Sequence, residues 1–155
     1  MYEPTQLLLQ LQQQAPVTAY CIYLFFGLSI GSFLNVVVHR LPIMLKQEWQ
    51  SEARLLLDVQ APGKQESKRY NLVTPRSACP ACGQPISSIH NIPLISYLLL
   101  KGRCASCQAR IALRYPLLEL VTGVATVTVI SVLGPTMQGM LACLLTYSLI
   151  ALSQI

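Results

Sequence analysis

Three long runs of hydrophobic residues, separated by polar stretches, set the pattern of the chain. Residues 17–38 contain no charged side chain and would form a helix of about 33 Å, long enough to cross a bilayer. The run 117–133 holds one acid, Glu119, and the run 137–155 follows it after the turn pair Gly134-Pro135. The pattern predicts an all-α polytopic membrane protein with three transmembrane helices, the last two forming a hairpin.

A polar loop, residues 39–116, separates the first two runs. Within residues 45–57 apolar side chains recur at helical spacing, which predicts an amphipathic helix that either lies on the membrane or packs on the rest of the loop. Residues 60–68 have the composition of a flexible linker. The apolar part of residues 91–102 is too short to span a bilayer, so we expect this segment to dip into the membrane interface or to cover part of the loop.

Composition supports a membrane protein. The chain is 53% hydrophobic and 11% charged, whereas soluble domains carry about 25% charged residues. All 11 Lys and Arg residues fall between Arg40 and Arg114, and residues 1–16 contain none. The positive-inside rule then predicts a cytosolic loop and a periplasmic N-terminal tail over residues 1–16. Because the cations flank hydrophobic segments, the net charge of +5 indicates contact with membrane lipids and no nucleic acid.

The loop contains two C-x-x-C motifs separated by a spacer. Their cysteines are Cys79, Cys82, Cys104 and Cys107. Two residues between thiolates let one tight turn direct both sulfurs at one cation, so two such turns predict a tetrahedral four-sulfur site for Zn²⁺. Gly83 suits the left-handed backbone of such a turn, whereas Gln108 occupies the matching position in the second motif.

Two disulfides, or four unrelated thiols, are the alternatives to a metal. Disulfides require an oxidising compartment, and the charge pattern predicts that this loop is cytosolic. Four cysteine ligands would leave no open coordination position, so we expect a structural zinc ion that holds together a loop too small to build its own core.

Small and polar residues mark one face of each of the first two predicted spans. Gly27 and Gly31 are four residues apart, a spacing that permits close helix contact. Ser32, Asn35 and His39 follow on one face, which indicates either a hydrogen-bonding seam between helices or a substrate contact.

Glu119, Thr122 and Thr126 share a face of the second predicted span. An acid this close to the interface should pair with a cation or face a cavity. Glu119 is therefore expected either to pair with Arg40 or Arg114 or to receive a cationic group such as a substrate amine.

Several motifs together resemble one family. G-S-F-L-N-V-V-V-H-R-L-P at residues 31–42, the paired C-x-x-C motifs, N-I-P-L-I-S-Y-L at residues 91–98 and R-Y-P-L-L-E-L-V-T-G at residues 114–123 are similar to those of bacterial prepilin peptidases of the A24 family. The resemblance covers the chain from the first predicted span to its end.

The resemblance implies an inner-membrane aspartic endopeptidase of type IV pilus and type II secretion biogenesis. Such an enzyme removes leader peptides from prepilins or pseudopilins and methylates the new N-terminus with S-adenosylmethionine. The family's loop cysteines correspond to the four named above. The family's N-terminal region, which carries the matches to Gly31, Asn35, Arg40 and Glu119, is linked to methylation or substrate docking. The resemblance therefore implies Asn35, Arg40 and Glu119 as candidate contacts.

The resemblance also implies two catalytic aspartates, the first just after a helix like residues 137–155. The one aspartate of this chain is Asp58, in the loop. Since an aspartyl dyad needs two adjacent carboxylates, we expect the N-terminal part of a prepilin peptidase, without its protease chemistry. A methyltransferase residing in this part and a non-catalytic membrane adaptor with a zinc-stapled loop are the alternatives.

Overall fold

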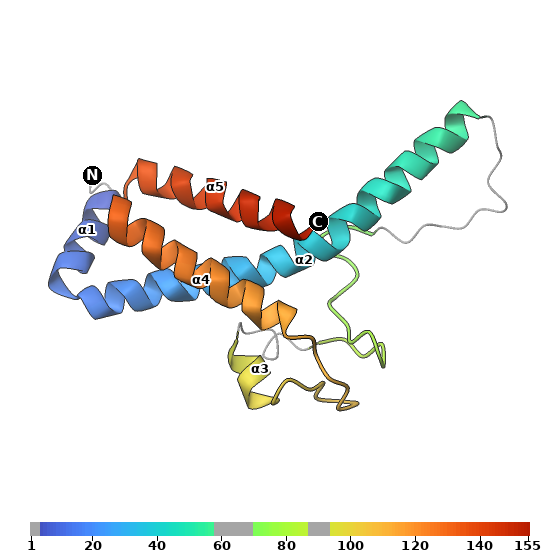
Figure 1. Cartoon of the computed structure of the whole chain (residues 1–155), viewed down its shortest axis with the longest axis horizontal. Helices are drawn as coiled ribbons and strands as arrows, with labels where there is room; N and C mark the ends of the chain where they lie inside the picture. The colour runs from blue at the N-terminus through green and yellow to red at the C-terminus, as the bar shows by residue number, and fades with distance from the viewer. Residues whose placement is uncertain (1–3, 58–69, 87–93) are drawn as a thin grey trace.

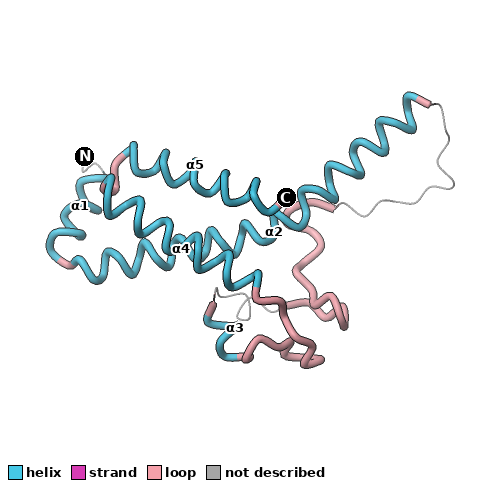
Figure 2. Tube along the Cα trace, viewed as in Figure 1, coloured by secondary structure: helices cyan, strands magenta, loops and turns pink. Residues whose placement is uncertain are grey.

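The computed structural model describes residues 4–57, 70–86 and 94–155. It contains five helices in these ranges: α1 (Pro4–Gln14), α2 (Pro16–Leu56), α3 (Ile95–Leu99), α4 (Arg114–Leu133) and α5 (Met137–Gln154). Helices α2, α4 and α5 lie alongside one another, and the loop that carries α3 lies beside one end of this bundle (Figures 1 and 2). The predicted all-α class is confirmed: in the described residues β pairing is confined to two isolated bridges.

Helix α2 is longer than the sequence pattern predicts. We expected a span ending at Val38 and a separate amphipathic helix over residues 45–57, but one helix runs to Leu56 with Pro42 inside it. Pro42 removes one backbone donor, yet the Leu, Met, Lys, Gln and Glu residues around it favour the helical state enough to continue it. The helix thus continues beyond Val38, and the end of the membrane span at that residue stays a prediction.

The end of α2 projects away from the bundle (Figure 1). Residues 46–57 are all exposed, and Trp49 is among them. We call the segment between α2 and α4, which carries the four cysteines, the metal loop. The exposure excludes, for the described residues, the alternative in which the amphipathic segment packs on the metal loop. The predicted linker over residues 60–68 and the aspartate Asp58 lie outside the described ranges.

The N-terminal segment, expected to be a loosely ordered tail or a short interfacial turn, forms a helix. Helix α1 is rich in Leu and Gln, which are good helix formers, and Leu8 and Leu11 pack against the buried core. Gln12 donates a hydrogen bond to the hydroxyl of Tyr20 on α2, 3.4 Å away. Leu7 and Leu11 are four residues apart, which is a helical spacing. The surrounding glutamines are polar, so the hydrophobic pattern of this short helix was hard to recognise.

Helices α2 and α4 make the closest contact in the bundle. A Cβ added at Gly31 would lie 2.7 Å from the Cα of Glu119, and one at Gly27 would lie 2.8 Å from the Cα of Gly123. Real Cβ atoms do not approach a backbone so closely, so only glycine permits this separation. The predicted small-residue contact is confirmed.

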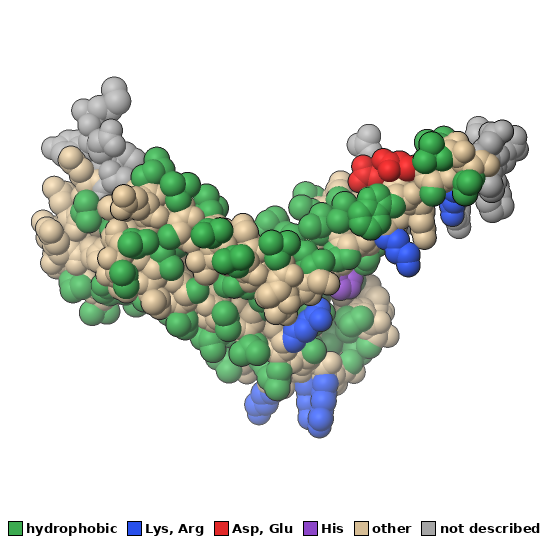
Figure 3. Space-filling view, turned by 45° about the horizontal axis from the view of Figure 1, so that its top comes forward, with side chains coloured by type: hydrophobic (Ala, Val, Ile, Leu, Met, Phe, Trp, Pro, Cys, Tyr) green, Lys and Arg blue, Asp and Glu red, His purple; other side chains and the backbone are tan. Residues whose placement is uncertain are grey.

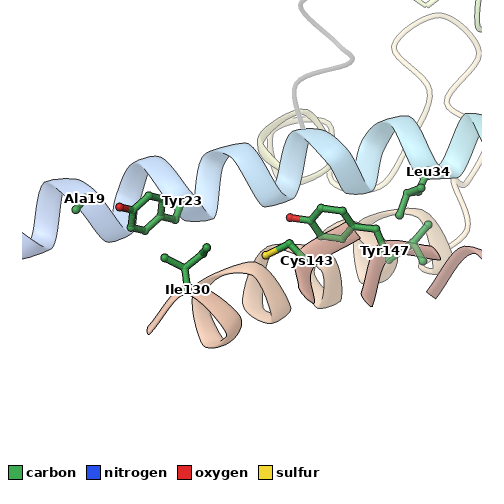
Figure 4. Close-up of a cluster of buried hydrophobic side chains, with 7 residues drawn as sticks. Ala19, Tyr23, Leu34, Ile130, Cys143 and Tyr147 are labelled. Atoms are coloured by element: carbon green, nitrogen blue, oxygen red, sulfur yellow. The ribbon is translucent and has the colours of Figure 1, made fainter. Parts of the chain in front are cut away.

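Helix α5 packs against both partners through a small buried cluster. The cluster contains Ala19, Tyr23, Leu34, Leu118, Ile130, Cys143 and Tyr147, and Figure 4 shows Cys143 and Tyr147 of α5 directed towards α2. The hydroxyls of Tyr147 and Thr126 are 2.7 Å apart, which ties α5 to α4. Cys143 is a buried free cysteine, so it serves as a packing residue in this cluster.

The outer surface of the bundle is apolar. Three helices, α2, α4 and α5, are long and apolar enough to cross a membrane. Hydrophobic side chains cover the visible bundle surface in Figure 3, whereas Lys and Arg side chains gather at the loop and along the projecting end of α2. Exposed hydrocarbon on this scale needs lipid as its solvent.

Candidate metal centre and its attachment to the helices

The first C-x-x-C motif folds into a tight turn. The Gly83 N–H donates to the Cys79 carbonyl at 2.8 Å, and the Cys79 N–H donates to the Gln84 carbonyl at 2.9 Å. Gly83 has φ +69°, the left-handed conformation that the sequence predicted. These bonds bring the cysteine side chains to one side of the turn.

The second motif repeats this arrangement. The Gln108 N–H donates to the Cys104 carbonyl at 3.0 Å, and the Cys104 N–H donates to the Ala109 carbonyl at 2.9 Å. Gln108 has φ +59°, so it adopts the conformation of Gly83 despite its Cβ. The two motifs are thus equivalent turns with unequal backbone strain.

The two turns face each other and bring four sulfurs together. The Sγ atoms of Cys79, Cys82, Cys104 and Cys107 all lie within 4.8 Å of one another, and none is in a disulfide. The Sγ atoms of Cys79 and Cys107 are 3.8 Å apart. A tetrahedral site with Zn–S bonds of about 2.3 Å has S···S edges of about 3.8 Å, whereas a disulfide needs about 2.05 Å. The four cysteines can hold a metal ion.

The pKa values of the Cys104 and Cys107 thiols are shifted in opposite directions. Hydrogen bonds from the backbone N–H groups of Cys107 and Ser106 lower the pKa of the Cys104 thiol to about 6. A backbone hydrogen bond from Ala109 lowers the pKa of Cys107, but hydrogen bonds with neighbouring thiols, that of Cys82 first, together with burial raise it to about 11. Four adjacent thiols cannot all ionise without a cation among them.

Arg40 fastens the loop to α2. Its guanidinium donates to the carbonyl of Asn71 at 2.9 Å and to that of Pro75 at 2.6 Å. It also lies over the ring of Tyr70, 5.8 Å from the centroid. Arg40 is 8% exposed, so these bonds are shielded from water and fix the loop firmly.

Asn71 shapes the segment that Arg40 binds. The Asn71 Oδ1 accepts hydrogen bonds from the backbone N–H groups of Val73 at 2.8 Å and Thr74 at 2.6 Å. This Asx-type turn presents the Asn71 carbonyl to the guanidinium and leads directly to Pro75, the second acceptor, four residues before the first C-x-x-C motif. Sequence analysis did not identify Asn71, because its partners are backbone N–H groups, which no residue type marks.

Glu119 fastens the second part of the loop to α4. Its carboxylate accepts a hydrogen bond from the Leu94 N–H at 2.8 Å and another from the Ser32 side chain. In the described part of the chain it pairs with neither Arg40, which binds backbone carbonyls, nor Arg114, which lies over Tyr115. Of the two predicted alternatives for Glu119, the ion pair is therefore not found among the described residues, and a cationic group such as a substrate amine stays a prediction.

Asn35 joins α2 to the start of α4. Its side-chain amide donates to the Tyr115 carbonyl at 3.1 Å. Ser32 and Asn35 therefore lie in a hydrogen-bonding seam between helices, one of the two predicted interpretations, while His39 is exposed beside it. Thr122 and Thr126 share the buried face of Glu119, as their spacing predicted.

The fold and the site define a helical membrane protein whose loop between its first two apolar helices carries four clustered cysteines able to bind a metal. Residues 25–133 match the family described as Bacterial Peptidase A24 N-terminal domain. The chain belongs to this family, which confirms the resemblance found in the sequence.

Full-length relatives carry a common name. The chain is 50% identical to the prepilin leader peptidase/N-methyltransferase of Aeromonas salmonicida strain A449 over 147 residues, 95% of this chain and 50% of that protein. It is 50% identical to the Pseudomonas aeruginosa protein of the same name over 132 residues and 43% identical to one from Burkholderia pseudomallei over 129 residues. The chain spans about half the length of the curated relatives it matches. No solved structure matches it.

Proposed function

We propose that the chain is the membrane-anchored, zinc-stapled N-terminal module of a prepilin leader peptidase/N-methyltransferase. The observation that carries the proposal is the four-sulfur cluster held beside the α2–α4 pair, in a chain that belongs to the A24 N-terminal family. Its substrates would be prepilins or pseudopilins, whose apolar helices would pack beside the exposed apolar faces of the bundle.

Zn²⁺ fits the donor set. Four thiolates at tetrahedral spacing favour a d¹⁰ cation, and with all four bound the ion has no open position for water or substrate. The metal would therefore supply structure to the loop. The residues that hold it would be Cys79, Cys82, Cys104 and Cys107.

The role of this chain would be to position the loop at one face of the membrane. Arg40 holds the part before the first cysteine turn, and Glu119 and Asn35 hold the parts flanking α3 and α4. We place this face in the cytosol and the N-terminus in the periplasm of the bacterial inner membrane, because every Lys and Arg lies between residues 40 and 114.

S-adenosylmethionine remains a prediction from the family resemblance and from the relatives' printed name. The side chains that we associated with methylation, those of Asn35, Arg40 and Glu119, use their hydrogen-bonding groups on the chain's own backbone in this arrangement. They do not form a set of free donors and acceptors for the cofactor. We therefore derive no step of methyl transfer, and their assignment to methylation or substrate contact stays a prediction.

A hybrid enzyme tests the proposal. The matching half of the Aeromonas salmonicida relative is replaced by this chain, and processing of a prepilin is followed in cells lacking their own peptidase. We expect the hybrid to process the prepilin, because this chain is 50% identical to the part of the relative that it replaces. A hybrid that inserts into the membrane at the parent's level and leaves the prepilin uncut would contradict the proposal.

Two cysteine variants of the hybrid distinguish the effect of losing the metal from the effect of changing a cysteine outside the cluster. Cys82→Ser removes a ligand candidate, and Cys21→Ser changes an exposed cysteine on α2 outside the cluster. We expect loss of bound zinc and of processing in the first variant and neither loss in the second. Elemental analysis of the purified full chain gives the metal content.

A further inference from the structure

The segment from Leu94 to Arg114 carries cations that neither the metal cluster nor the helix contacts require. Lys101, Arg103, Arg110 and Arg114 are all exposed. No acid occurs between residues 70 and 118. A loaded Zn(Cys)₄ centre would carry a charge of about −2, so a net positive surface remains around it.

This segment lies beside the membrane helix and not beyond its end. The Leu94 N–H is bound to Glu119, which lies five residues into α4 from Arg114, or about 7.5 Å along the helix axis. Figure 1 shows α3 next to the first turns of α4. Since α4 carries no charged residue beyond Glu119, a bilayer around α4 would bring its headgroup boundary to the level of α3.

Exposed apolar side chains accompany the cations at this depth. Ile95 is 51% exposed, Leu98 72% and Leu99 77%. Leu113, directly before Arg114, is 71% exposed. Leucines on a short helix with Lys and Arg at its edge form the pattern of an interfacial membrane anchor.

We propose that the segment 94–114 is a second, peripheral membrane anchor that binds anionic phospholipid headgroups. Leu98 and Leu99 enter the interface, and Lys101, Arg103, Arg110 and Arg114 contact lipid phosphates. The lipid would thereby fix the metal loop flat against the bilayer, in addition to the internal attachment through Arg40 and Glu119. The occupant is the bilayer because the surface is basic, apolar and continuous with a membrane helix.

The test places a fluorescent reporter on α3. The full chain, metal-loaded, carries Leu98→Trp in a Trp49→Phe background, since Trp49 is the sole tryptophan. It is reconstituted in phosphatidylcholine nanodiscs in which a minor fraction of lipid has brominated acyl chains, either as phosphatidylglycerol or as phosphatidylcholine. Bromine quenches tryptophan on contact, so the two series compare anionic with zwitterionic lipid.

We expect blue-shifted emission and stronger quenching by brominated phosphatidylglycerol. Each cation should favour the anionic lipid about fivefold, which corresponds to about 1 kcal/mol, so Arg103→Gln with Arg110→Gln should lower the relative association constant about 25-fold. The matched control is Lys46→Gln with Arg54→Gln, which removes two exposed cations from the projecting end of α2. The control should leave the preference unchanged.

Three results would overturn the proposal. Equal quenching by the two brominated lipids shows that the cations do not select anionic headgroups. Emission typical of water without quenching shows that α3 stays outside the membrane. Blue-shifted emission that neither lipid quenches shows that another surface, such as a second copy of the chain, covers α3 instead.

Discussion

The α2–α4 helix pair and the metal loop achieve a fixed structure by opposite means. The helices approach through glycines and bury a continuous face, with Thr122 fully buried and Leu118, Glu119 and Thr126 beside it. In the described loop, between α2 and α4, Cys79 is the one buried hydrophobic residue. A segment without a core of its own cannot offset its conformational entropy through burial, so the loop depends on sulfur ligands and on side chains from the helices.

Loss of the metal should therefore affect the two regions very unequally. Cys82→Ser with Cys107→Ser, or chelation of the metal, should unfold both cysteine turns, because structural zinc sites contribute on the order of 10 kcal/mol. The helical signal in circular dichroism should stay. Hydrogen exchange at the Gly83 and Gln108 amides measures the loss, with Cys21→Ser as control. Equal loss of protection in α4 would contradict the separation of the two regions.

The reverse experiment targets the helix contact. Gly31→Leu places a side chain against the backbone of Glu119 and should separate α2 from α4, at a cost of about 1–3 kcal/mol. Thermal unfolding in detergent measures it, and Cys21→Leu, which places the same leucine side chain on an exposed part of α2, is the control. Metal content should remain, since no cysteine ligand touches this contact. Loss of zinc in Gly31→Leu would show that the regions fold as one unit.

Arg40 connects the regions, so its removal tests the connection itself. Arg40→Gln leaves the carbonyls of Asn71 and Pro75 without their charged donor, and should weaken loop attachment by about 2–4 kcal/mol. Proteolysis between residues 70 and 76 should accelerate while the cysteine turns keep their metal. The neighbouring His39→Gln, on an exposed side chain, is the control. An unchanged cleavage rate would show that the metal alone fixes the loop.

The contrast also explains which features could be predicted from the sequence. The three candidate spans follow from long apolar runs, and the Gly27–Gly31 contact and the cysteine cluster follow from short spacings. The structure contains all three features. The partners of Arg40 and Glu119 are backbone groups far along the chain, and a backbone group has no residue type to recognise in a sequence. The continuous helix through Pro42 was not predicted either, because the helix formers on both sides of a proline decide whether it ends a helix.

Proton uptake should oppose metal binding in the loop and leave the helix pair unaffected. With a raised pKa of about 11, Cys107 carries a proton at neutral pH that must leave when the metal binds. Zinc affinity should therefore rise at least about tenfold per pH unit from pH 7 to 8, and its dependence on pH should become steeper below pH 6 as Cys104 also becomes protonated. Competition with a zinc chelator across this range gives the slope, and a pH-independent affinity would show that the thiols are already ionised without metal.

The smallest effect distinguishes the two cysteine turns from each other. Gly83 and Gln108 share a positive φ, but only Gln108 carries the Cβ that this conformation disfavours by about 1–2 kcal/mol. Gln108→Gly should therefore stabilise the second turn by about 1 kcal/mol, and Gly83→Ala should destabilise the first by a similar amount. A Cβ at Gly83 meets nothing within 4 Å, so the loss would report backbone strain alone. Rates of zinc transfer to a chelator measure both variants, and a slower transfer from Gly83→Ala would show that the turns differ by more than their left-handed residue.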